Sequence, residues 1–243
     1  MPFLFIRLRP NWGFAVRLQP QSKMRETFIY PPPTTLIGAL SYPLMRQSEG
    51  RKEVIQISMG KIVSSADHLR RLLKAVAASF IGGRGLTYGS YLKVNRNYRG
   101  KIEQAITALP VNIILGRSDV FLDVVYILDS VDESILRAGW GITRIGSRES
   151  IFSTEEVLSG EERKRRGKSV ETRFSFEIKP NIQVEGRGSV LEVVDWRTAE
   201  IGDYTNAKKS LYFYPEQRVT VRSEEGLDFY ELDLPWGREA IIA

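Results

Sequence analysis

The sequence predicts an α+β fold, a ferredoxin-like or RRM-like sandwich with a projecting hairpin and a β-rich C-terminal part. Two successive strand–helix–strand patterns fit into the first 150 residues, which is the element order of such a sandwich. Residues 84–101 have neither a helical period nor a large apolar face, as expected of a hairpin that projects from the body. The last third consists mostly of short runs of strand type. The hydrophobic content of 42% is ample for a core in 243 residues.

The first half of the sandwich is predicted from apolar periodicity and from two helix-capping sites. Three prolines at 31–33 hold the backbone extended, and Thr34 or Thr35 can cap the helix that follows. Apolar residues at helical spacing after residues 65–67 indicate a second helix. The predicted elements are a strand at 3–8, an extended piece at 13–18, a helix at 36–45, a strand at 54–63 and a helix from 65–67 to the glycines at 82–83.

The second half repeats the pattern, and a C-terminal extension follows it. Strands are predicted at 111–115 and 120–128, a short helix at 132–138, and later strands at 173–178, 190–194, 211–214, 217–221 and 229–232. The mixed-charge run at 161–168 is interpreted as a loop. We therefore divide the chain into a sandwich with its hairpin at 1–155 and a β-rich extension, packed on it, at 156–243.

Composition excludes several classes of protein. The chain has no cysteine, so disulfides, thiolate catalysis and cysteine-based zinc sites are excluded. No apolar run reaches the roughly 18–20 residues that cross a bilayer. The first residues lack the basic region and cleavage site of a signal peptide, so we expect a cytoplasmic protein with no membrane contact.

The net charge of +6 hides a strong asymmetry along the chain. Residues 1–102 carry 17 basic and 4 acidic side chains, whereas residues 103–243 carry 18 basic and 25 acidic ones. Between Asp67 and Glu103 there are eight basic side chains and no acid. A solvated surface is the simplest explanation of a basic run, but repulsion along so long a segment favours a polyanionic partner. Nucleic acid is the partner that this pattern predicts.

Two short motifs carry groups that bind phosphate. The run at 31–40, Pro-Pro-Pro-Thr-Thr-Leu-Ile-Gly-Ala-Leu, combines a helix N-terminus with hydroxyls and with Gly38, where a backbone can approach. The alternative is an ordinary capped helix. The run at 144–150, Arg-Ile-Gly-Ser-Arg-Glu-Ser, offers two guanidinium groups beside a small, approachable loop. Its alternative is a salt bridge within the loop, for instance to Glu149.

Together these motifs resemble the CRISPR-associated Cas-five family of the RAMP superfamily, most closely its archaeal type I-A branch. They occur in the family's order, about 110 residues apart, and the run at 61–67, Lys-Ile-Val-Ser-Ser-Ala-Asp, supports the match. The resemblance covers residues 1–155. It implies a ferredoxin-like palm and a protruding thumb at about 84–101, which together cap the 5′ handle of a guide crRNA in a type I, Cascade-like complex. The implied partners are a Cas-seven-type backbone subunit, the large subunit and, indirectly, target DNA.

The predicted RNA-binding residues are basic, hydroxyl-bearing or aromatic, and they come from the two motifs, the thumb and the basic N-terminal half. Tyrosines among cations suit single-stranded RNA, because bases stack on the rings while cations hold the backbone; packing against neighbouring subunits is the alternative for the tyrosines. The set is Lys23, Arg25, Thr34, Thr35, Arg84, Tyr88, Tyr91, Lys93, Arg96, Arg99, Lys101, Arg144, Ser147 and Arg148.

Catalysis is the minority hypothesis. Some relatives in type I-C systems cut CRISPR repeat RNA, which would require a general base and a general acid. The single histidine, His68, is expected in the first turn of a helix, facing solvent. Glu177-Ile178-Lys179 mimics part of a metal-dependent nuclease motif but has no convincing aspartate partner, and no phosphate-binding Gly-Lys loop is present. We therefore expect neither catalytic residues, nor a metal, nor a cofactor; repeat-RNA cleavage and general single-stranded RNA binding remain the alternatives.

Overall fold

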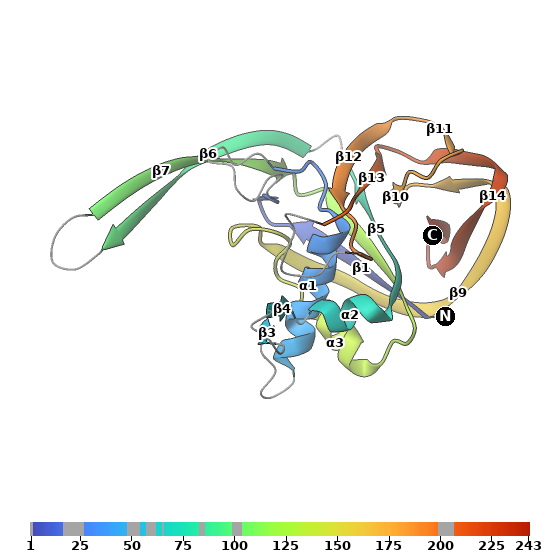
Figure 1. The fold of residues 1–243 in the computed structure, drawn as a ribbon, viewed down its shortest axis with the longest axis horizontal. Helices are drawn as coiled ribbons and strands as arrows, with labels where there is room; N and C mark the ends of the chain where they lie inside the picture. Colours follow the sequence, from blue (N-terminus) through green and yellow to red (C-terminus); the bar gives the residue numbers. More distant parts are fainter. Residues whose placement is uncertain are drawn as a thin grey trace.

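The computed structural model describes residues 2–16, 27–47, 54–56, 62–64, 66–82, 86–98, 104–198 and 207–243 (Figure 1). The helices are α1 (Pro33–Arg46), α2 (Ala66–Leu72) and α3 (Glu133–Trp140). The strands are β1 (Pro2–Pro10), β2 (Gly13–Phe14), β3 (Val54–Gln56), β4 (Ile62–Ser64), β5 (Leu73–Ile81), β6 (Leu86–Tyr98), β7 (Gln104–Gly116), β8 (Phe121–Leu128), β9 (Phe152–Thr172), β10 (Phe176–Glu177), β11 (Gln183–Glu185), β12 (Gly188–Val194), β13 (Lys209–Pro215), β14 (Val219–Leu234) and β15 (Gly237–Ile242).

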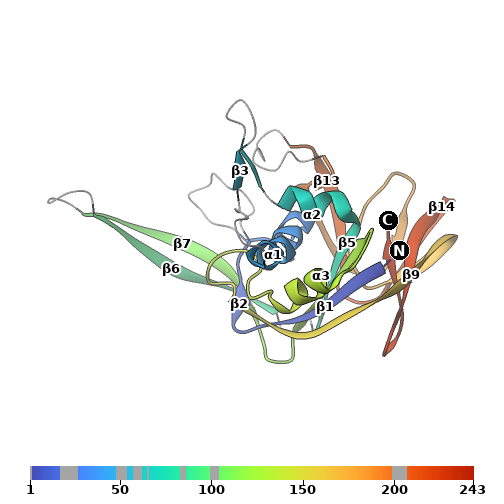
Figure 2. The same cartoon turned by 90° about the horizontal axis from the view of Figure 1, so that it is seen from below.

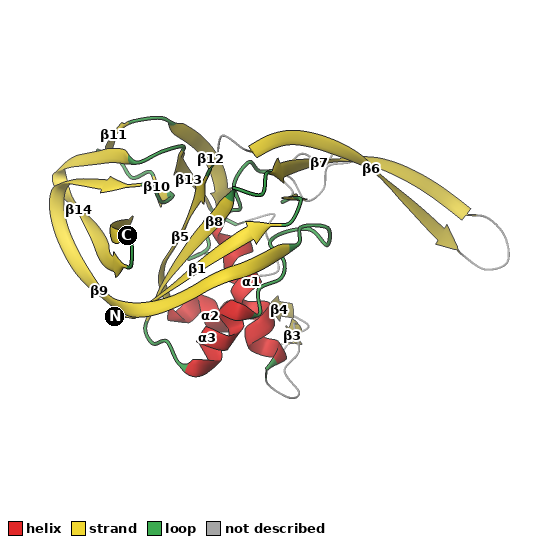
Figure 3. Ribbon diagram, turned by 180° about the vertical axis from the view of Figure 1, so that it is seen from behind, coloured by secondary structure: helices red, strands yellow, loops and turns green. Residues whose placement is uncertain are grey.

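The centre of the molecule is a ferredoxin-like palm. Its strands lie in the order β9-β1-β8-β5 with every neighbouring pair antiparallel. All three helices lie on one face of this sheet (Figure 3). Alternate residues of β1, including Leu4, Ile6 and Leu8, are fully buried against α1 and α3. The predicted α+β sandwich is therefore confirmed.

The opposite face of the palm sheet is enclosed by the C-terminal strands. The long strand β9 pairs with β1 through its first half and with β14 through its second half, so the boundary placed at residue 155 falls inside one continuous strand. Beyond β9, the Ser175 amide donates to the carbonyl of Ala78 (2.8 Å), which places this segment along the edge of β5. A second apolar cluster that includes Phe5, Val125 and Leu232 fills the enclosed space. Figures 1 and 2 show β9 and β14 curving around this face.

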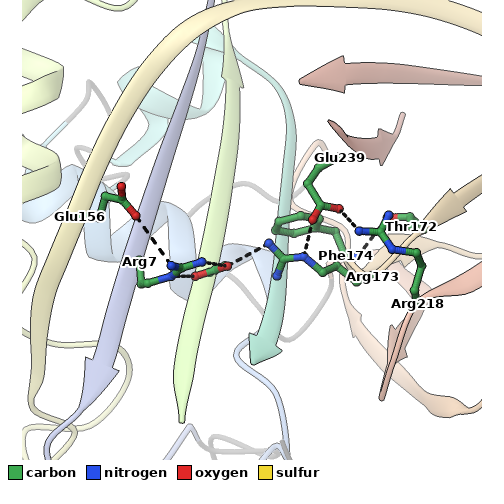
Figure 4. A network of polar contacts seen from close by, with 8 residues as sticks. Arg7, Glu156, Thr172, Arg173, Phe174, Arg218 and Glu239 are labelled. Carbon is green, nitrogen blue, oxygen red and sulfur yellow. Dashed lines mark hydrogen bonds and ion pairs between the residues drawn. The ribbon is translucent and has the colours of Figure 1, made fainter. Parts of the chain in front are cut away.

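A buried ionic network joins the palm to the C-terminal strands (Figure 4). The carboxylate of Asp123 is fully buried and accepts hydrogen bonds from Arg7 (2.8 and 3.0 Å) and from Arg173 (2.9 Å). Arg173 also donates to Glu239 (2.8 Å), which accepts a further bond from Arg218 (2.9 Å). Because each buried carboxylate faces two guanidinium groups, the charges compensate one another across five segments of the chain.

A two-stranded antiparallel ribbon, β6 and β7, projects from the body and corresponds to the predicted thumb (Figure 1). It is longer than expected, since its return strand continues to Gly116. The short strand β2 pairs with the end of β7, where Gly13 lies opposite Leu115. The base of the ribbon is thereby attached to the N-terminal segment.

Several predicted elements are wrong in ways that tertiary structure explains. Residues 73–81 form β5 and not the end of a helix. Both faces of this strand are buried, so its sequence is an unbroken apolar run without the alternation that would have indicated a strand. Residues 161–168 continue β9, since charged side chains there pair across the sheet, as Arg163 does with Asp233 (3.1 Å). Residues 54–63 are not one strand, because Val54 lies opposite Ser64 in a hairpin.

The C-terminal strands and the start of α1 also differ from prediction. The two strands expected at 217–221 and 229–232 are parts of the single strand β14. The residue that precedes α1 is Pro32, with no side-chain cap, so Thr34 and Thr35 lie inside the first turn and cannot cap it. None of the helices in the described part of the chain is long and apolar enough to cross a membrane.

Candidate nucleic-acid interface

The loop at 144–150 is held in a fixed shape by backbone hydrogen bonds. The Ser150 amide donates to the carbonyl of Ser147 (3.1 Å), and the Ser147 amide donates to the carbonyl of Ala15 (2.9 Å). Gly146 has a φ of +99°, and a Cβ there would lie 2.6 Å from the Ala15 oxygen. Only glycine therefore suits this position. The buried hydroxyl of Ser150 accepts from the Ala15 amide (2.9 Å), which completes the attachment to the N-terminal segment.

Trp12 connects this loop to the base of the ribbon. Its indole nitrogen donates to the carbonyl of Glu149 (2.8 Å), and its ring lies 6.1 Å from the ring of Tyr91 on β6. The loop and the ribbon base consequently lie side by side, as the sequence hypothesis requires. Trp12 was absent from the predicted site, because one tryptophan beside a turn carries no sequence signal of a contact with residues 137 positions away.

The two sequence motifs meet in a cleft of about 350 Å³ between α1 and the segment after α3. Apart from the backbone of its own helix and its chain neighbours, nothing lies within 4 Å of the position that a Cβ would take at Gly38, so the helix is open towards this cleft. The residues that line it are Thr35, Gly38, Ala39, Tyr42, Pro43, Gly141, Thr143, Arg144 and Gly146. The motif at 31–40 and the motif at 144–150 thus form two walls of one feature.

The charges at this cleft are suited to an anionic ligand. Arg144 and Arg148 are exposed, and among the described residues neither forms an ion pair or a hydrogen bond. The intramolecular salt bridge that we considered for the loop, to Glu149, is not formed by either arginine. By contrast, the exposed Arg137 on α3 pairs with Glu133. Two guanidinium groups on a rigid loop are available for bidentate contacts with phosphate.

The predicted thumb tyrosines have different surroundings. Tyr88 is 56% exposed, whereas Tyr91 is half-buried and packs near Ala15 and Ile113 at the ribbon base. Successive strand residues point to opposite faces, so two tyrosines three positions apart cannot lie on one face of β6. Tyr88 is available for stacking on a base, and Tyr91 contacts Trp12.

The remaining predicted site residues fall into three groups. Thr34 and Ser147 are half-buried, and the hydroxyl of Ser147 lies 3.0 Å from that of Ser150. Lys93 and Arg96 lie on β6 by their backbone, and their side chains are outside the described part. Outside the described residues altogether are Lys23, Arg25, Arg84, Arg99 and Lys101.

The side chains considered for catalysis either do not line the cleft or are paired with other groups of the protein. His68 is exposed on α2 and is not among the residues that line the cleft. Glu177 pairs with Arg197 (2.7 Å), and Lys179 donates to the carbonyl of Ala243, so both residues of the nuclease-like motif have structural partners. Within the described ranges no cluster of acidic or histidine side chains could hold a metal ion.

Comparison with known proteins places the chain in a family. It is 32% identical over 193 residues to "CRISPR system aCascade subunit Cas5 1" of Saccharolobus solfataricus, covering 77% of this chain and 76% of that protein. The chain belongs to the CRISPR-associated Cas5 family. A second protein of that organism, "CRISPR-associated protein Cas5 3", is 32% identical to this Cas5 chain over 197 residues, with the same coverage.

Structural comparison agrees with the fold. The crystal structure of a CRISPR protein from Archaeoglobus fulgidus superposes on this Cas5 chain with a TM-score of 0.66 at 18% identity, covering 100% of this chain and 99% of that one. No family model matches the sequence. The two Saccharolobus solfataricus relatives confirm the predicted family and its archaeal affinity, and the Archaeoglobus fulgidus structure confirms the fold class.

Proposed function

We propose that this Cas5 protein binds and caps the 5′ handle of a guide crRNA, as a non-catalytic subunit of a type I, Cascade-like complex. The observation that carries the proposal is the contact of Trp12 with both Glu149 and Tyr91. It joins the arginine-bearing loop to the base of the thumb, so that the arginines lie beside the ribbon that carries the exposed Tyr88.

The enclosed face of the palm sheet supports this location. RNA-recognition domains stack bases on aromatic residues of an open sheet. Here the corresponding face is covered by the apolar cluster that includes Phe5, Val125 and Leu232. The ion pairs of Asp123 with Arg7 and Arg173 join the sheet to the segment after β9. RNA is therefore directed to the helix-and-loop side, where Arg144 and Arg148 contact phosphates and Tyr88 stacks on a base.

The proposed partners follow from the family and from charge. The first relative above carries the name of an aCascade subunit, and we extend that role to this chain. The acidic residues that predominate after position 102 suit contact with basic neighbouring subunits. We propose that these are a Cas-seven-type backbone subunit and the large subunit, with target DNA reached indirectly through the guide.

A filter-binding titration with handle RNA at several salt concentrations tests the RNA-binding role. The variant Arg144→Ala/Arg148→Ala should bind more weakly, and its salt slope should fall by about 0.7 for each phosphate that the protein no longer neutralises. Arg187→Ala/Lys208→Ala is the matched control, because it removes two exposed cations far along the chain from the loop. Equal affinity and slope in the two variants would remove the loop from the RNA site, and indifference to the handle sequence would favour a general RNA-binding protein.

The non-catalytic assignment has its own test. His68 is the only histidine, and it lies outside the cleft. The variant His68→Ala should therefore retain RNA binding and leave the length of a CRISPR repeat RNA unchanged, as should the wild-type protein. Shortening of that RNA by the wild type and not by the variant would establish the endoribonuclease alternative.

A further inference from the structure

A second groove continues the cleft along α1 towards the end of that helix. It has a volume of about 460 Å³ and is lined by Tyr42, Pro43, Arg46, Gln47, Arg137 and Gly141. Three of these residues, Tyr42, Pro43 and Gly141, also line the cleft beside Arg144, so the two hollows share a wall. A path therefore leads from the loop at 144–150 along the seam between α1 and α3.

The floor of the seam is fixed by close packing of the two helices. A Cβ at Gly141 would lie 2.8 Å from the Cβ of Pro43. Gly141 ends α3, and its amide donates to the carbonyls of Arg137 and Ala138 (3.0 Å each). The hollow is consequently a preformed feature of two packed helices, which is a property of binding sites.

The walls of the seam combine positive charge with an exposed aromatic ring. Among the described residues that line the two hollows, three are arginines and none is acidic; Arg137 pairs with Glu133, which leaves Arg46 and Arg144 as the cations of the walls. Arg46 is exposed and forms no ion pair with a described residue. Between Arg46 and Arg144 lies Tyr42, which is 48% exposed. Cations on either side of an aromatic face are the arrangement that holds single-stranded nucleic acid, with the backbone on the cations and a base on the ring.

We infer that this seam, here called the α1–α3 groove and defined by the two sets of lining residues, binds a continuation of the same RNA strand, with one base stacked on Tyr42 and a phosphate at Arg46. The inference rests on the proposed function and extends it, because none of the predicted site residues lies beyond Arg144 along this path. An acidic segment of a partner protein would also suit the arginines. The shared wall favours RNA, since a strand bound at Arg144 enters the groove without crossing any other surface.

Fluorescence anisotropy with nested oligouridylates, lengthened one nucleotide at a time, tests the inference. The affinity of the wild type should rise when the RNA becomes long enough to reach the groove. Tyr42→Ala should lack that step and bind the longer RNAs at least about fivefold more weakly, whereas Tyr42→Phe should retain it. Arg46→Ala should lower the salt slope for long RNAs by about 0.7, and Arg187→Ala should not. Tyr42 and Arg46 are exposed, so equal melting temperatures will establish that the variants are folded.

The outcomes separate this inference from the proposed function. If Arg144→Ala/Arg148→Ala binds weakly at every length while Tyr42→Ala matches the wild type at every length, the groove does not bind RNA and the proposed function stands. If Tyr42→Ala impairs only assembly with a partner subunit, the groove is a protein-binding surface and the inference is overturned. If the wild type binds neither these RNAs nor the handle RNA, both fail together.

Discussion

Replacing Asp123 by asparagine removes a fully buried negative charge that two arginines share. The carboxylate lies 2.8 Å from Arg7 and 2.9 Å from Arg173, whose side chains are 23% and 14% exposed. Asparagine has nearly the same shape, so the variant tests the charge and not the packing. Arg7 also lies over the ring of Trp236 (4.5 Å), which precedes β15, so its position affects the C-terminal strands directly.

The size of the effect follows from leaving two guanidinium groups without their shared anion. Breaking a buried ion pair by removing one partner costs about 3–5 kcal/mol of unfolding free energy. A domain of this size loses roughly 2–4 °C of melting temperature for each kcal/mol, so Asp123→Asn should lower the melting temperature by about 6–20 °C. The enclosed face of the sheet should open first, because the network joins β1 and β8 to the segments before β14 and within β15.

Circular dichroism during heating measures this shift, and urea unfolding measures the free energy. Glu192→Gln is the matched control, because Glu192 and its partner Lys209 are each 57% exposed and such pairs contribute at most about 1 kcal/mol. If Asp123→Asn is no less stable than Glu192→Gln, the network does not hold the C-terminal strands on the palm.

Three further predictions concern local structure and pH. Asp132 caps α3 by accepting from the Ile135 amide (2.9 Å), so Asp132→Ala should cost about 1 kcal/mol in urea unfolding, and an unchanged midpoint would contradict the cap. Gly146→Ala should weaken handle RNA binding and destabilise the protein by about 1–3 kcal/mol, because φ is +99° and a Cβ would meet Ala15. Gly38→Ala, in open space on a helix, should instead stabilise the protein by up to about 1 kcal/mol. The reverse order of the two melting temperatures would refute the loop geometry. Burial raises the pKa of Tyr212 to about 12 and also raises the pKa of Tyr126 and of Tyr214. Unfolded tyrosines ionise near pH 10 while these three stay protonated, so stability should be complete below about pH 10 and fall above it by up to about 1.4 kcal/mol per pH unit for each tyrosine; a flat alkaline profile in urea unfolding would contradict their burial.

The sequence predicted the parts of the fold that local pattern determines. The strand predicted at 3–8 and the short helix predicted at 132–138 are of this kind, since β1 spans Pro2–Pro10 and α3 spans Glu133–Trp140. The strand β5 could not be recognised, because its two faces are buried in different clusters and its apolar run resembles a helix. The second half of β9 was missed because its charges are neutralised by β14, which is distant in sequence.

The candidate site shows the same division. Its arginines and glycines were evident as motifs, because chemistry that binds phosphate uses few residue types. Their meeting in one cleft, and the link through Trp12, depend on contacts between segments more than 100 residues apart, such as Ala15 with Ser150. Tyr42 and Arg46 share the helix face of Thr35 and Gly38, and that helical spacing was the signal that could have found them.

Ultraviolet crosslinking of the complex purified from the native host, followed by mass spectrometry, tests most directly whether the loop and the thumb hold one RNA end. The account predicts that a guide RNA of uniform 5′ end accompanies the protein, with its 5′ nucleotides crosslinked to peptides that contain Tyr88 and residues 144–150. Crosslinks of the 5′ end confined to β12 and β13, or co-purification without any guide RNA, would contradict it.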